Sequence, residues 1–322
     1  MSFKVSQSKI KVWRHCRKQY DYKYVQELTK KYKPMPFLRG TIIHDMLEAH
    51  YTNKDPWKVF KAHIKENEKL LRTHVEEYGD LENNLKILMT GYFDYYEDED
   101  ITPISVEGEF ETPLTKGIIL TGKRDMIAKH QKMKWMMEHK GHNTIPNDGI
   151  VPYANIQTGL YVWSYNKENK KPLEGILWNY LWCKPLTIPQ LLKDGTMSMK
   201  AINTTWTMYK KELIKNKLNP KDYEEMKEKL EGQEDLIYQR KLVPINMDMI
   251  EKIVDETIIT AKEMEKLGGV DTTRNLGYDC DRCEFRELCM AQLKGLDYNY
   301  ILKANFKKRE KDDGHKKVRQ KN

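Results

Sequence analysis

The chain has 322 residues, of which 32% are charged, 39% hydrophobic and 10% aromatic. This length can bury one large core or two modest ones, and this composition excludes a disordered chain. No stretch is apolar for long enough to span a membrane, and the first residues lack the apolar core of a signal peptide, so we expect a cytoplasmic protein without membrane association.

The formal net charge of +8 is distributed unevenly along the chain. Residues 1–33 hold ten Lys and Arg against two acidic residues, and residues 303–322 hold nine against three. The first of these segments also carries Trp13, Tyr20, Tyr22, Tyr24 and Tyr32, a composition that suits a phosphate backbone and stacked bases. DNA is therefore an expected partner, the alternative being a solvated helix face at one end. We expect residues 303–322 to be disordered.

The first hundred residues carry helical patterns. Ser6 or Ser8 is a suitable cap for a first helix that runs through Tyr20. Two prolines between residues 30 and 40 end this helix, and a second helix is predicted over residues 41–51. A long charged amphipathic region follows, from Trp57 to Tyr96.

The middle of the chain changes to a strand-rich texture. Three segments separated by short turns, residues 104–114, 117–130 and 133–143, predict an antiparallel meander. A helix and a buried strand are predicted next, over residues 155–167 and 174–183. Residues 186–245 read as a helical insertion, and a late amphipathic helix covers residues 247–267. Together these patterns predict one α/β core with helical additions.

Two acidic residues stand among apolar residues of adjacent predicted strands. Glu138 and Lys140 share one face of their strand, while His139 points to the other. If this strand pairs with the preceding one, Asp125 converges with Glu138, and two partly buried carboxylates repel unless a cation compensates. Mg²⁺ or Mn²⁺ suits such oxygen ligands, with Lys140 placed to assist water or stabilise charge on phosphorus. The alternative is a strand that ends at Met137 and is followed by solvated charges.

An acid followed on the next strand by Glu-X-Lys resembles the signature of the PD-(D/E)XK nuclease superfamily. The resemblance implies a mixed central β-sheet flanked by helices, with Asp125, Glu138 and the backbone carbonyl of His139 as metal ligands and Lys140 assisting the attacking water. An apolar residue is common at the position of His139, so the role of its side chain stays open.

Two helical segments extend the resemblance to the RecB-type members. "RGTIIHDMLEAHY" resembles the helix that supplies a metal-binding histidine, which gives His44 that role. "QTGLYVW" matches the Q-X-X-X-Y motif, whose residues sit beside the metals and contact the nucleic acid backbone, here Gln157 and Tyr161. Without the resemblance, His44 reads as a surface residue of a polar helix and Tyr161 as core packing.

The cysteines point to a second site. Cys280, Cys283 and Cys289 form C-X2-C-X5-C, and three thiolates at this spacing need a fourth, Cys16 or Cys183. Cys183 ends a buried strand and is assigned a packing role. A remote N-terminal cysteine with this triplet resembles the iron–sulfur staple of RecB-like exonucleases: the CRISPR-associated type, the AddB-like subunits and their phage relatives. It implies a 4Fe–4S cluster on Cys16 and the triplet, with zinc as the alternative.

The motifs occur in the expected order across residues 6–289. The resemblance implies a metal-dependent DNA exonuclease acting on single strands or duplex ends, with a nuclease domain over 1–302. Its catalytic core covers 100–182, and its iron–sulfur subdomain covers 1–33 and 270–302. The insertion resembles bacteriophage members, which implies the host cytoplasm and replication or recombination proteins as partners. Two alternatives are a catalytically silent DNA-end-binding module and a zinc-stapled RNA-processing nuclease.

Overall fold

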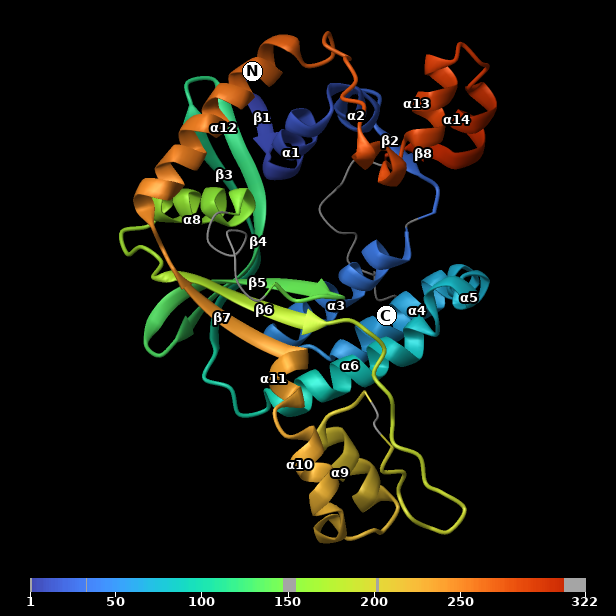
Figure 1. Cartoon of the computed structure of the whole chain (residues 1–322). Coiled ribbons are helices and arrows are strands. Elements are labelled where there is room, and N and C mark those ends of the chain that lie inside the picture. The colour runs from blue at the N-terminus through green and yellow to red at the C-terminus, as the bar shows by residue number, and fades with distance from the viewer. Residues whose placement is uncertain (1, 33, 147–154, 201–202, 310–322) are drawn as a thin grey trace, which may run out of the picture. The chain divides into compact units, whose positions relative to one another are not determined.

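The computed structural model describes residues 2–32, 34–146, 155–200 and 203–309 (Figure 1). The chain divides into two compact units. The first comprises Met1–Lys33, Glu111–Gly122 and Lys252–Asn322, and the second comprises Pro34–Phe110 and Lys123–Glu251. We describe each unit by itself.

The second unit is built on a mixed sheet with helices on both faces, the α/β architecture that the sequence predicts. Its strands follow the order β4 (Ile118–His130), β5 (Met133–His142), β6 (Gly175–Trp182) and β7 (Tyr238–Pro244). The β4–β5 and β6–β7 pairs are antiparallel and the β5–β6 pair is parallel. Strand β3 (Thr102–Thr115) also pairs with β4, so the predicted strands β3 to β5 are adjacent in the sheet.

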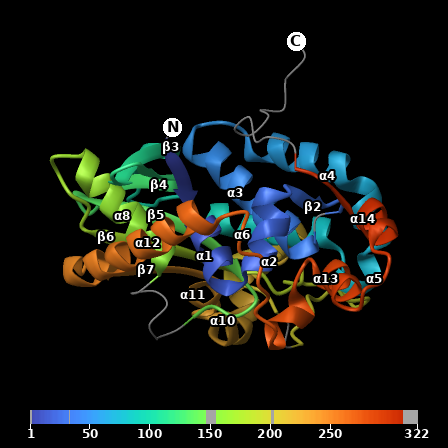
Figure 2. The same ribbon diagram turned by 90° about the horizontal axis from the view of Figure 1, so that it is seen from above.

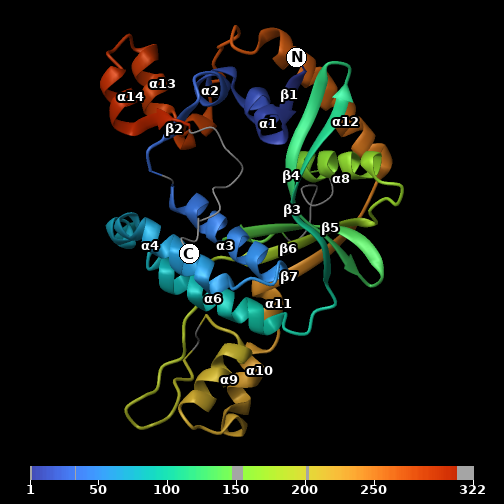
Figure 3. The same ribbon diagram turned by 180° about the vertical axis from the view of Figure 1, so that it is seen from behind.

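Helices α3 (Met35–Tyr51), α4 (Pro56–Thr73) and α6 (Leu81–Tyr95) cover one face of this sheet, and α8 (Ile156–Glu168) covers the other (Figures 1 and 3). The short helix α5 (Val75–Tyr78) follows α4. Aspartate or asparagine side chains cap α4, α6 and α8 by accepting backbone N–H bonds in the first turn. Helix α3 begins at Met35 and not at the predicted residue 41, because Pro36 fits the first turn of a helix.

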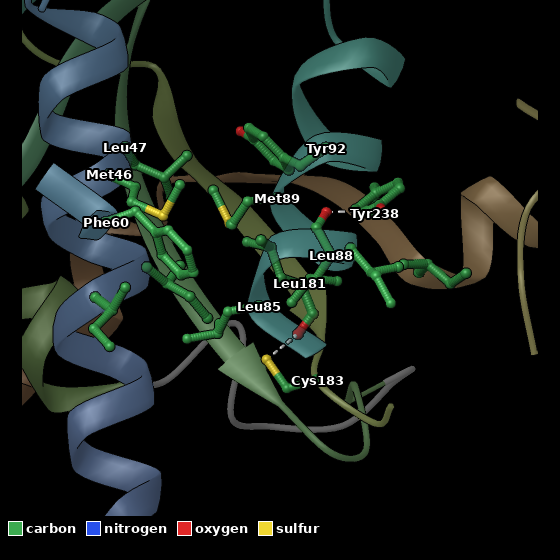
Figure 4. Packing of buried hydrophobic residues seen from close by; sticks show 14 of the residues in the cluster. Met46, Leu47, Phe60, Leu85, Leu88, Met89, Tyr92, Leu181, Cys183 and Tyr238 are labelled. Carbon is green, nitrogen blue, oxygen red and sulfur yellow. Dashed lines mark hydrogen bonds between the residues drawn. The ribbon is translucent and has the colours of Figure 1, made fainter. Parts of the chain in front are cut away.

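The main core of this unit lies between α3, α6 and the sheet (Figure 4). Met46 and Leu47 of α3 meet Leu85 and Met89 of α6 over the strand residue Leu181. Every one of these five side chains is fully or almost fully buried. Apolar burial of this kind contributes about 1.5–3 kcal/mol per large side chain, so α3 is fixed firmly against the sheet.

The predicted insertion is helical only in part. It contains α9 (Trp206–Lys215), a 3₁₀ turn (Pro220–Tyr223), α10 (Glu224–Leu230) and α11 (Gln233–Ile237). A small core of its own joins these elements. The predicted end at residue 245 is wrong, because residues 238–244 form β7 and pair with β6. The sequence of β7, with three consecutive polar residues, Gln239 to Lys241, shows no alternation of polar and apolar residues that would predict a strand.

The first unit combines terminal segments. Strand β1 (Phe3–Ser6) runs parallel to the start of β4, and Ser6 caps α1 (Gln7–His15) as predicted. The predicted single helix breaks at Cys16, whose backbone is extended, and continues as α2 (Arg17–Tyr20) and a π-helical turn (Asp21–Val25). Helix α1 packs against the later part of α12 (Met247–Leu267), where Trp13 donates a hydrogen bond to Glu263 (Figure 2).

The C-terminal part of the first unit contains a 3₁₀ turn (Tyr278–Arg282), α13 (Arg286–Leu293) and α14 (Asn299–Asn305). Strand β8 (Phe306–Lys308) pairs antiparallel with β2 (Leu28–Lys30), so the prediction of disorder from residue 303 is wrong for this stretch. The basic side chains leave enough apolar residues, Phe306 among them, to anchor the strand. Residues 310–322 lie outside the described part of the chain. No described helix is long and apolar enough to cross a membrane.

Candidate metal and nuclease site

Two buried carboxylates meet where β4 and β5 pair. The register joins Met126 to Met137, which places Asp125 and Glu138 next to each other on the opposite face of the sheet. Glu138 is fully buried and Asp125 is 8% exposed. The backbone N–H of His139 donates to Oδ2 of Asp125 over 2.8 Å, which ties the two strands together at this point.

Glu138 uses only one of its two oxygens within the protein. Its Oε1 accepts hydrogen bonds from Nζ of Lys140 at 2.5 Å and from Nε2 of Gln157, on α8, at 2.8 Å. Its Oε2 is buried and has no hydrogen-bond partner in the described part of the chain. A buried carboxylate oxygen without a partner is costly, so this atom is suited to bind a cation.

Two further side chains that can bind a metal, those of His44 and Glu107, lie close to Asp125. Donor atoms of His44, Glu107 and Asp125 lie within 4.8 Å of one another, and Nδ1 of His44 is 3.6 Å from Oδ2 of Asp125. One nitrogen and two carboxylates form a donor set that divalent metals accept. The His44 side chain is only 30% exposed, which does not favour the alternative interpretation of His44 as a surface residue of a polar helix.

Glu107 is a residue that sequence reasoning did not single out. It lies on β3 with a positive φ of 51°, which is uncommon for a residue other than glycine, and its carboxylate forms an ion pair with Lys123 at 2.5 Å. The available signal was an acidic residue next to glycine inside a strand pattern, "VEGEF". That pattern is common in strands with one solvated face, so it did not distinguish Glu107 from its neighbours.

The electrostatics of the site favour a bound cation. Burial, together with the charge of Asp125, raises the pKa of Glu138 to about 7. Burial also raises the pKa of Asp125 to about 6, although Lys140 and the His139 N–H oppose this. Burial by itself lowers the pKa of Lys140, but the two carboxylates outweigh it and raise that pKa. Each carboxyl group therefore releases its proton at a higher pH than usual while no metal compensates its negative charge.

The imidazole of His139 lies on the other face of β5, within a buried polar network. Arg240 of β7 can only donate, so Oδ1 of Asn179 faces its Nε at 3.4 Å, and the Asn179 amide nitrogen donates to Nδ1 of His139 at 2.8 Å. The His139 ring is therefore neutral, with its proton on Nε2, and stacks on Tyr51. Burial and the nearby His44 lower its pKa well below the usual range. This network holds the backbone of His139 beside Asp125.

Helix α8 is attached to the sheet through Arg124. Its guanidinium donates to the carbonyl of Tyr161 at 3.3 Å and to Oγ of Ser164 at 2.6 Å, and it lies 4.1 Å from the ring centre of Phe110. Tyr161 is 8% exposed and packs edge-on against Phe110. The helix thus brings Gln157 to Glu138. The ring of Tyr161 contributes to the packing of α8 against Phe110.

The four predicted cysteine ligands line a single pocket in the first unit. Cys16 lies at the break between α1 and α2, Cys280 on the 3₁₀ turn, Cys283 just after it and Cys289 on α13, around a cavity of about 50 Å³. Among the described residues, no three of these sulfurs fall within 4.8 Å of one another. The arrangement is a shared pocket and not a closed ligand shell.

Cys183 is separate from this pocket, as predicted. It is buried at the end of β6, in the core of the second unit, and its S–H donates to the carbonyl of Leu181 (Figure 4). Burial raises the pKa of its thiol to about 11. It behaves as a small apolar core residue.

Comparisons with known proteins identify the family. The family model of the PD-(D/E)XK nuclease superfamily matches residues 4–290. The chain belongs to this superfamily. Members of this superfamily cleave nucleic acids with the help of divalent metals. None of the curated proteins matches the sequence significantly. The crystal structure of SSO0001 matches 79% of this chain and 84% of the SSO0001 chain, with 12% sequence identity and a TM-score of 0.29.

Proposed function

We propose that this PD-(D/E)XK protein is a Mg²⁺- or Mn²⁺-dependent DNA exonuclease. The observation that carries the proposal is the fully buried Glu138, whose neighbours are Asp125 and Lys140 and whose Oε2 has no hydrogen-bond partner among the described residues. A nucleic acid substrate follows from the superfamily, whereas DNA and cleavage from an end rest on the sequence resemblance to RecB-type exonucleases.

In this proposal each residue of the site has a separate role in metal binding or in stabilising the phosphate. His44, Glu107, Asp125 and Glu138, with the His139 carbonyl, would hold the metal, which supplies charge to polarise the phosphodiester and to acidify water. Lys140 keeps its proton at neutral pH and stabilises negative charge on the phosphate. Gln157 fixes the Glu138 carboxylate through Oε1 and leaves Oε2 for the metal.

The test is digestion of single- and double-stranded DNA labelled at either end, with Mn²⁺ or with EDTA. We expect cleavage only with metal, with products released from one end. The Lys140→Ala variant is expected to lose cleavage by a factor of at least about 10² while it keeps its fold and its DNA binding. Lys129→Ala, at an exposed position on β4, is the matched control. Cleavage at the wild-type rate by Lys140→Ala would rule out this assignment.

A 4Fe–4S cluster in the cysteine pocket is part of the proposal. Its support is that Cys16, Cys280, Cys283 and Cys289, distant in sequence, line one cavity. A zinc ion held by the same four cysteines is the alternative occupant of this pocket.

Anaerobic purification followed by iron and zinc analysis and visible absorbance distinguishes the two metals. We expect about four iron atoms per chain and the broad absorbance of iron–sulfide bonds. Cys283→Ala should lose both signals, whereas Cys183→Ala, the cysteine outside the pocket, should keep them. One zinc per chain without iron would contradict the cluster and favour a zinc-stapled nuclease.

The second candidate is a silent DNA-end-binding module of a replication or recombination assembly. The intact set of His44, Asp125, Glu138 and Lys140 speaks against it. A phage origin, with host replication or recombination proteins as partners, is proposed only from the sequence of the insertion. The same digestion separates the candidates, because a silent module binds labelled DNA and leaves it uncut with Mn²⁺.

A further inference from the structure

A polar cavity lies in the second unit, beyond the carboxyl ends of β5 and β6. Its volume is about 240 Å³. Arg39 of α3, Asn84 of α6, and Asn143 and Lys184 just after the two strands contribute its polar groups, and leucines of α6 form its apolar wall. Among the described residues that line it, two are cationic and none is acidic. A cationic cavity without a carboxylate is suited to an anion.

Arg39 has hydrogen-bond donors left for a ligand. One terminal nitrogen, Nη1, donates to Oδ1 of Asn143 at 3.0 Å and to the carbonyl of Cys183 at 3.3 Å. Its Nε is buried and has no hydrogen-bond partner in the described part of the chain. These two bonds fix the guanidinium plane, so the remaining donors are held in place before any ligand arrives.

The surroundings of the cavity are also positive. Burial lowers the pKa of His142, the last residue of β5, and the charges of Lys140 and Arg39 lower it further. Lys184 is exposed and lies 5.4 Å from the ring centre of Trp182, so its ammonium group faces solvent at the rim. Arg39 and Lys184 therefore offer a fixed and a mobile cation to the same ligand.

The distance to the nuclease site suits a nucleic acid strand. Asn143 is three residues beyond Lys140, or about 10 Å along an extended chain. Arg39 is five residues before His44 on α3, or about 7.5 Å along the helix. Both spans are short, so the cavity and the carboxylates can contact neighbouring parts of one nucleic acid strand.

We propose that this cavity binds a phosphate group of the substrate strand, close to the bond that is cut, through Arg39 and Lys184. The proposal rests on the function proposed above and deepens it. The ends of parallel strands are where α/β proteins bind their ligands, and the leucine wall gives the adjoining sugar an apolar surface. The phosphate is either internal to the strand or a terminal phosphate, and the two share this chemistry.

The test measures binding of fluorescein-labelled oligothymidylates in EDTA, where no cleavage occurs, over a range of salt concentrations. Each phosphate contact on a single strand contributes about 0.7 to the slope of log K against log salt. Arg39→Gln and Lys184→Gln are each expected to lower that slope by about 0.7. Lys86→Gln, at an exposed position of α6 outside the cavity, is the matched control and should leave the slope unchanged.

Three substrates identify the phosphate. A strand with a 5′-phosphate, the same strand with a 5′-hydroxyl and a closed circle are compared. An equal loss on all three assigns an internal phosphate, and a loss confined to the 5′-phosphorylated strand assigns a terminal one. Lys184→Gln guards against misfolding, because Lys184 is exposed whereas Arg39 also holds the Cys183 carbonyl.

Failure of this inference differs from failure of the nuclease proposal. Wild-type protein that neither binds nor cuts DNA would contradict the proposed function itself. Wild-type protein that cuts DNA, with both cavity variants binding at the wild-type salt slope, would overturn the phosphate site alone.

Discussion

Without a bound metal, the buried charge of Glu138 should lower the free energy of unfolding at neutral pH. The substitution Glu138→Gln should restore the lost stability. Glu138 is fully buried, and its pKa is raised to about 7 from the usual 4.5 by burial and by Asp125. Gln keeps the shape of the side chain and an oxygen that accepts from Lys140 and Gln157, but it carries no charge. The variant therefore removes the cost of the charge and little else.

The pKa shift sets the size and the sign of this effect. The difference between the usual pKa of 4.5 and the pKa of about 7 in the folded chain corresponds to about 3 kcal/mol in the free energy of unfolding, because each pKa unit is equivalent to about 1.36 kcal/mol. Below pH 4.5 the carboxyl is protonated in the folded and the unfolded chain, so the shift has no effect. As pH rises from 4.5 to 7, the unfolded chain releases this proton and the folded chain keeps it, so the free energy of unfolding falls. Above pH 7 the full cost remains.

The assay is urea denaturation of wild type and Glu138→Gln in EDTA at pH 5 and pH 8. We expect the variant to be about 3 kcal/mol more stable at pH 8 and less than about 1 kcal/mol more stable at pH 5. Mn²⁺ should stabilise wild type more than the variant, because it binds the folded site. Glu109→Gln, exposed on β3, is the control. A difference between wild type and Glu138→Gln that is the same at both pH values would refute the reasoning.

Two further substitutions examine what supports the site. Asn179→Leu removes the donor to His139 and the acceptor of Arg240, and should cost about 2–4 kcal/mol in urea denaturation, against less than about 0.5 kcal/mol for the exposed control Asn83→Leu. Gly175→Ala places a methyl group against the Val243 carbonyl and 2.6 Å from the Trp135 ring, so its thermal midpoint should fall by several degrees, and an unchanged midpoint would contradict the tight β6–β7 packing.

The strands of the nuclease core were predictable because their apolar runs are bounded by clear turns. "TKG" and "QKMK" separate β3, β4 and β5, and the pairing of Met126 with Met137 follows from the short connection between β4 and β5. The proximity of Asp125 to Glu138 could be predicted from the same register. Strand β7 was not found, because its partner β6 lies some sixty residues earlier, and only tertiary pairing selects a strand there.

The ligand set was predictable only in part, because some of its members depend on geometry that spacing does not encode. The motifs predicted His44 and Gln157 as site residues, whereas no motif singled out Glu107, whose carboxylate lies near His44 and Asp125 in the folded chain. Arg39 lay unnoticed in "FLRG", since a basic residue near a helix start has no particular meaning until the ends of β5 and β6 are placed beside it.

His139 shows how both faces of one strand serve the site. Its neighbours Glu138 and Lys140 point to the face of α8, so its own ring points to the face of α3, where it stacks on Tyr51. The ring is neutral because Asn179 donates to it, and Asn179 is oriented in turn by Arg240, which pairs with Glu99. A larger apolar residue would fill this space without fixing the strand through hydrogen bonds. The histidine between Glu138 and Lys140 is therefore held by Asn179, and this hydrogen bond fixes the backbone of β5 where it meets Asp125.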